Sequence, residues 1–83
     1  MVVIHDAKLL KAARVALGLK QDDLATLAGV SKDTVQKLEA DASSVRRPLY
    51  VKVVAALELQ GIEWLPATGD RGEGFRLVPH VRV

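Results

Sequence analysis

The sequence predicts a mainly α-helical fold: a bundle of four to five helices followed by a short C-terminal β-hairpin or strand extension. Apolar residues recur every three or four positions between residues 6 and 60, the spacing of helices that bury one face. Near the C-terminus apolar and polar side chains alternate, as they do in strands. At 83 residues the chain has room for a single domain, 1–83, with the bundle at 6–60 and the β extension at 61–83. Because only 4% of the residues are aromatic, we expect an aliphatic core.

The first helix is expected to begin at Asp6, whose carboxylate can cap the N–H groups of the first turn. Leu10, Ala13 and Leu17 follow at helical spacing and predict its buried face. Gly18 is expected to end the helix, because glycine enters the left-handed conformation without strain.

The second and third helices are expected to follow at short intervals. Residues 21–28 carry two aspartates in the first turn, where the helix dipole favours negative charge, and Gly29 ends the helix. The third helix is predicted over 31–40, capped by its first residue, a serine. Val35 and Leu38 form its apolar side.

A fourth helix is predicted after the polar loop 41–44. Pro48 suits its first turn, where the missing N–H is not needed, and Gly61 ends it. Two short strands, 62–64 and 75–77, are then expected to form a hairpin around a turn-rich loop. Residues 2–4 are a further candidate strand.

The segment 21–38 has the pattern of two helices that cross steeply through a three-residue turn. A small side chain is needed where such helices nearly touch, and Ala25 is there. The turn needs a residue that tolerates positive φ, and Gly29 is there. The wedge between the helices is filled by Leu24, Ala28, Val30, Val35 and Leu38.

This segment resembles the Cro/C1-type (XRE) family of helix-turn-helix DNA-binding proteins, and the resemblance covers roughly residues 6–60. The resemblance implies a lambda-repressor-like bundle whose third helix enters the DNA major groove. It also implies that Gln21 contacts a phosphate and that the residues opening the third helix contact base edges. The matching residues are Gln21, Leu24, Ala25, Ala28, Gly29, Val30, Ser31, Val35, Leu38, Glu39, Arg47 and Pro48.

With Val35 and Leu38 facing the core, the third helix turns a polar face outward. The candidates for reading bases on that face are Lys32, Asp33, Gln36 and Lys37. The alternative for the two lysines is a solvated helix face, and the alternative for Asp33 is stabilisation of the helix dipole. Glu39 is expected to be structural, paired with an arginine of the following loop.

Phosphate or minor-groove contacts are expected around the ends of the helices. Arg46 and Arg47 precede the fourth helix, whose N-terminus itself favours phosphate, although ordinary surface charge is the alternative. Asp41 stands where this family often has glycine, so the path of the loop and the direction of Arg46 stay open. The candidates for such contacts are Gln21, Ser31, Thr34, Arg46 and Arg47.

Composition excludes several other classes of protein. The chain has no cysteine, so disulfides and thiolate metal sites are excluded. No apolar run approaches the roughly 20 residues that cross a membrane, and we expect a cytoplasmic protein. The two histidines lie near the termini, and the glycines within 67–74 lead into a strand rather than the helix that a phosphate-binding loop requires. We therefore expect no enzymatic activity, no metal, no cofactor and no small-molecule ligand.

One reading helix covers few base pairs, so binding as a homodimer to an inverted repeat in double-stranded DNA is expected. The fourth helix and the C-terminal strands are both candidates for the dimer interface. The predicted function is a sequence-specific transcriptional regulator, acting as a repressor by occupying its operator. The alternative is a protein–protein module on the same fold, such as an antiactivator or an antitoxin. The candidate interface residues are Trp64, Leu65, Phe75 and Leu77.

Overall fold

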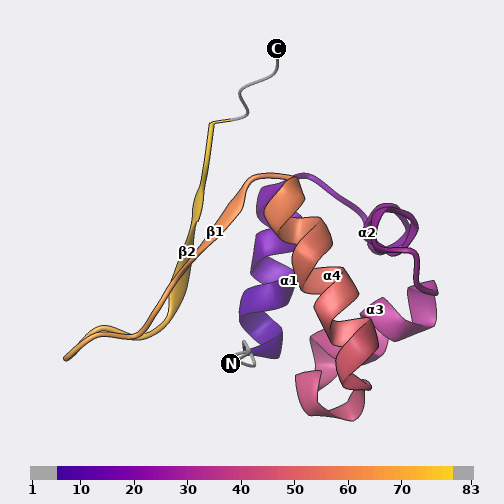
Figure 1. Ribbon diagram of the computed structural model, residues 1–83, viewed down its shortest axis with the longest axis horizontal. Helices are drawn as coiled ribbons and strands as arrows, with labels where there is room; N and C mark the ends of the chain where they lie inside the picture. Colours follow the sequence, from indigo (N-terminus) through magenta and orange to yellow (C-terminus); the bar gives the residue numbers. More distant parts are fainter. Residues whose placement is uncertain (1–5, 80–83) are drawn as a thin grey trace.

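The computed structural model describes residues 6–79 and contains four α-helices followed by a two-stranded antiparallel sheet. In Figure 1, α1 and α4 stand side by side, α2 and α3 lie on one side of them, and the hairpin extends on the other. The predicted mainly α-helical class is confirmed, and a short 3₁₀ turn, η1, adds to the four helices. The elements are α1 (Ala7–Ala16), α2 (Gln21–Ala28), α3 (Lys32–Ala40), η1 (Ala42–Ser44), α4 (Arg47–Leu59), β1 (Ile62–Leu65) and β2 (Gly74–Leu77).

Local signals set the ends of the helices as predicted. Asp6 accepts a hydrogen bond from the N–H of Lys8 at 2.7 Å and so caps α1. Gly18 has φ of 74° just after α1. Pro48 lies in the first turn of α4, which begins one residue earlier. The candidate strand at residues 2–4 lies outside the described residues.

The core is almost entirely aliphatic, as the composition predicted. Tyr50 is the one aromatic side chain of the described part of the chain that is fully buried. Every helix and β1 contribute to a single cluster, so the position of α3 is fixed from three sides by α1, α2 and α4. The buried residues are Leu10, Ala13, Leu24, Ala25, Val35, Leu38, Ala42, Tyr50, Val53, Ala56, Leu57 and Ile62.

The C-terminal hairpin packs its aromatic face on the helices. In the register of β1 and β2, Trp64 lies opposite Phe75, with ring centroids 6.2 Å apart in an edge-to-face arrangement. Both rings are partly buried against the core, whereas Leu77 of β2 is 50% exposed. Strand β2 contacts α1 and β1 contacts α4. The hairpin is therefore joined to the bundle along one face only.

The loop between the strands extends away from the helices (Figure 1). Its tip is a tight turn in which the N–H of Thr68 donates to the carbonyl of Arg71 at 2.9 Å, and the N–H of Arg71 donates back at 2.7 Å. Gly69 adopts φ of 51° there, as expected for the first central residue of such a turn. No helix within residues 6–79 is long and apolar enough to cross a membrane.

Candidate nucleic-acid interface

Helices α2 and α3 are joined by a turn that depends on Gly29. This glycine has φ of 71°, and its N–H donates to the carbonyl of Thr26 at 3.3 Å. The N–H of Val30 donates to the carbonyl of Ala25 at 3.0 Å, which completes a Schellman-type end to α2. Ala25 is buried where the two helices pack together. The predicted helix-turn-helix is thus confirmed in its bounds and in the conformation of its turn.

The outer face of α3 carries the four predicted base-reading side chains. Val35 and Leu38 are both 0% exposed and anchor the opposite face of the helix in the core. Four polar positions of the helix therefore project into solvent. The exposed residues on this face are Lys32, Asp33, Gln36 and Lys37.

Both lysines of this face have an acidic neighbour. The ammonium of Lys37 lies 3.1 Å from the carboxylate of Asp33, one turn earlier on α3, and that of Lys32 lies 3.4 Å from the carboxylate of Asp22 on α2. All four side chains are more than half exposed, so each pair contributes only about 0–1 kcal/mol. Such weak pairs can be exchanged for contacts with phosphates or base edges at little cost.

A buried ion pair joins α3 to α1. The Nε of Arg14 donates to Oε2 of Glu39 at 2.7 Å, and its Nη2 donates to Oε1 at 3.2 Å. Glu39 is therefore structural as predicted, but the expectation that it pairs with an arginine of the following loop is wrong. The actual partner comes from α1, because Leu10 and Ala13 are buried and place Arg14 at the border of the core.

Glu39 also connects to the polar face of the helix-turn-helix. Its Oε1 accepts a hydrogen bond from Nε2 of Gln21, at the start of α2, at 3.1 Å. The Oε1 of Gln21 in turn accepts from Nε2 of Gln36 on α3 at 3.5 Å. Gln21 is half-buried and Gln36 is exposed. The predicted phosphate-contacting residue and a predicted base-reading residue are thus brought together.

The two hydroxyl groups near the start of α3 are joined to each other. Ser31 accepts from the N–H of Thr34 at 3.1 Å and so caps the helix as predicted, and the two hydroxyls lie 2.9 Å apart. Both remain near the N-terminus of α3, where N–H groups and the helix dipole favour an anion.

The connection from α3 to α4 makes its turn without glycine. Asp41 is extended, with φ of −160°, and its carboxylate accepts from the N–H of Ser43 at 3.0 Å and from the Ser43 hydroxyl at 2.7 Å. These hydrogen bonds lower the pKa of Asp41. The η1 turn that results was not predicted from the sequence, and the aspartate two residues before Ser43 is the signal that could have indicated it.

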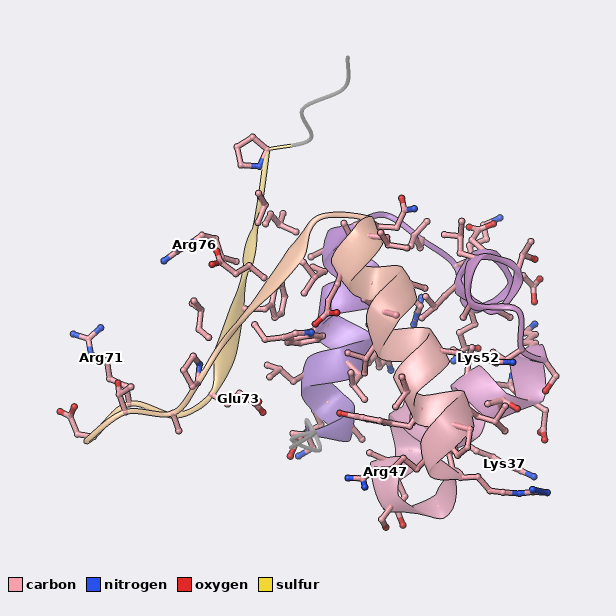
Figure 2. All side chains as sticks on the ribbon, in the orientation of Figure 1. Lys37, Arg47, Lys52, Arg71, Glu73 and Arg76 are labelled. Carbon is pink, nitrogen blue, oxygen red and sulfur yellow. The ribbon has the colours of Figure 1, made fainter. Side chains whose placement is uncertain are left out.

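Three basic side chains around the start of α4 are exposed, and the structure gives their charged groups no ion pair within residues 6–79: Arg46, Arg47 and Lys52. Figure 2 shows that Lys37 and Arg47 point to different sides of the connection between α3 and α4. Lys52, which the sequence analysis did not single out as a site residue, lies on the same side of α4 as Lys37 in that view. No group of three acidic or histidine side chains among the described residues could hold a metal ion.

Comparison with known protein families shows to which family this helix-turn-helix belongs. A family model described as "Helix-turn-helix" (HTH_3) matches residues 10–65, which is more than half of the chain and includes α2 and α3 whole. The chain belongs to this helix-turn-helix family. The family, of the XRE or Cro/C1 type, consists of DNA-binding regulators, so the resemblance predicted from residues 21–48 is confirmed. No curated protein matched the chain in a search.

Proposed function

We propose that this helix-turn-helix protein is a cytoplasmic transcriptional regulator that binds an inverted-repeat operator as a homodimer and represses by occupancy. The observation that carries the proposal is the exposed polar face of α3 on a helix whose other face is locked in the core. The B-DNA major groove admits an α-helix, and its base edges present a distinct pattern of donors and acceptors.

In this proposal each side chain on the outer face of α3 contacts the base whose donors and acceptors complement its own. Lys32 donates to guanine O6 and N7, Lys37 donates to guanine and lies close enough to the backbone to neutralise a phosphate, Gln36 pairs with adenine, and Asp33 accepts from a cytosine amino group. Positioning contacts to phosphates come from the α2 and α3 N-termini and from the start of α4. The residues proposed for these positioning contacts are Gln21, Ser31, Thr34, Arg46 and Arg47.

We place the dimer interface on the outer edge of β2. Trp64 and Phe75 are largely occupied by packing on the bundle, whereas Leu77 is half exposed at a strand edge that no other strand of residues 6–79 covers. Exposed edges of this kind can pair with a second copy. Leu65, on the opposite face of the hairpin from Trp64, is half-buried on β1 and pairs with Gly74, the first residue of β2. A two-fold dimer would present two α3 helices to half-sites about 34 Å apart.

The rival function, a module whose main target is a protein, is less well supported. Protein interfaces are depleted of charge at their centre and enriched in aromatic residues. The outer face of α3 has the opposite character, because it carries lysine, aspartate and glutamine and no aromatic side chain.

Selection of bound duplexes from a random DNA pool tests the proposal. We expect recovery of an inverted repeat whose half-sites are one helical turn apart. A Gln36→Ala variant should relax the preference at one position in each half-site, while Gln60→Ala at the end of α4 should recover the wild-type motif. Recovery of no motif by the wild-type protein would overturn the proposal, and a single unpaired half-site would overturn its dimeric part.

A further inference from the structure

The carboxylate of Glu39 is fixed by the two hydrogen bonds that it accepts from Arg14. Its side chain is only 5% exposed, and that of Arg14 is 11% exposed. The Nη1 of Arg14 also donates to the carbonyl of Leu19 at 2.8 Å, so the guanidinium is fixed from both α3 and the connection between α1 and α2. Glu39 therefore presents its Oε1 in a constant place and, paired with a guanidinium, as an ionised group.

An ionised carboxylate only accepts hydrogen bonds, and this decides the orientation of Gln21. The amide of Gln21 must turn its NH₂ toward Glu39, because the opposite orientation would set its carbonyl oxygen against the carboxylate. The observed hydrogen bond from Nε2 of Gln21 has this sense. The carbonyl oxygen of Gln21 is consequently directed toward α3, where it can only accept.

The amide of Gln36 donates to that oxygen, and this contact orients the amide. One hydrogen of its Nε2 points toward Oε1 of Gln21, at a distance of 3.5 Å between the heavy atoms. This bond is long, so it biases the amide without holding the side chain away from DNA. The second Nε2 hydrogen and the Oε1 of Gln36 remain available for a base. Gln36 thus offers one donor and one acceptor in a set order.

We infer that Glu39 is a positioning residue that sets the hydrogen-bond polarity of Gln36, and that it thereby makes the protein prefer adenine to guanine at the base which Gln36 reads. Adenine presents an acceptor, N7, beside a donor, N6–H, whereas guanine presents two acceptors, N7 and O6. With adenine, a Gln36 amide held in this order sets its NH₂ against N7 and its oxygen against N6–H. With guanine, the same amide sets its oxygen against the oxygen O6, and both of these atoms are acceptors. The inference rests on the proposed function, since it requires that Gln36 contacts a base.

The test measures the ratio of dissociation constants for two duplexes that differ only by adenine or guanine at the position identified through Gln36→Ala. Wild-type protein is expected to favour adenine by roughly tenfold or more. In Glu39→Gln the neutral amide can donate or accept, so Gln21 and Gln36 can turn either way and the ratio should fall to about twofold or less. A purely structural Glu39 would weaken both duplexes equally and leave the ratio unchanged.

Gln21→Met provides a second variant that leaves the buried ion pair intact. Gln21→Met should also lose the preference for adenine over guanine. Loss of its phosphate contact would weaken binding to both duplexes and leave their ratio unaffected. If Glu39→Gln does not fold, Gln21→Met alone tests the inference. Glu58→Gln on α4, which removes an equal charge away from α3, should keep the wild-type ratio. Selective binding by the wild type with an unchanged ratio in Gln21→Met would overturn the inference alone. Absence of any selective binding by the wild type would overturn the proposed function first, so the two failures are distinguishable.

Discussion

Replacing Leu38 by alanine is expected to lower the free energy of unfolding by about 2–5 kcal/mol. Leu38 is 0% exposed and belongs to the cluster through which α3 packs on its neighbours. The truncation removes apolar contacts and leaves a cavity that the surrounding helices can close only in part. Since natural domains are stable by only about 5–15 kcal/mol, much of the stability of this small chain would be lost. Urea denaturation followed by circular dichroism measures the change.

The matched control is Leu59→Ala, which makes the same chemical change at the exposed end of α4. Leu59 is 76% exposed, so its truncation should change the free energy of unfolding by less than about 0.5 kcal/mol. Equal effects of the two substitutions would show that α3 is not anchored as described, and its outward face would then have no fixed orientation.

The affinity for a selected duplex is expected to fall roughly 10³-fold between 50 mM and 200 mM salt. If Lys37, Arg46 and Arg47 of each subunit neutralise one phosphate each, six contacts form per dimer, and the slope of log K against log salt concentration is about −5. Fluorescence anisotropy over a salt series measures it. A slope near zero would contradict an interface built on these basic residues.

Single charge removals locate those contacts. Arg46→Gln should make the slope shallower by about 2 for the dimer, because one phosphate contact is lost from each subunit. Arg71→Gln, at the tip of the hairpin and far from the helices in Figure 2, should leave the slope unchanged. Arg47 points away from Lys37 in Figure 2, so its proposed phosphate contact is tested separately. Arg47→Gln should also make the slope shallower by about 2, and an unchanged slope would remove Arg47 from the interface. A slope that responds only to Arg71 would move the interface to the hairpin.

The bounds of the helices could be predicted because their signals are local. A capping carboxylate at Asp6, glycines at 18 and 29, and a serine at 31 each act within one turn of the residue that carries them. The outward face of α3 followed from two apolar residues three apart on one short helix. Tertiary packing only had to bury those two residues to leave the polar face exposed.

Long-range partners could not be predicted in the same way. Arg14 and Glu39 are 25 residues apart, and no sequence pattern around either residue indicates that the other is its partner. The chain of hydrogen bonds that continues to Gln36 depends on the crossing of α2 and α3, which the sequence indicates only in outline. Period-two alternation predicts that Phe75 and Leu77 share a face of their strand, but the register with β1 sets Trp64 beside Phe75, and packing decides that this face lies on the bundle.

The measurement that tests the central claim most directly is the change in backbone amide chemical shifts when the isotope-labelled protein is titrated with a selected duplex. The largest changes are expected at residues 32–37 and at the start of α2, with little change at 68–71 of the hairpin tip. Largest changes in the hairpin or along α1, with α3 unaffected, would contradict the assignment of α3 as the DNA-reading helix.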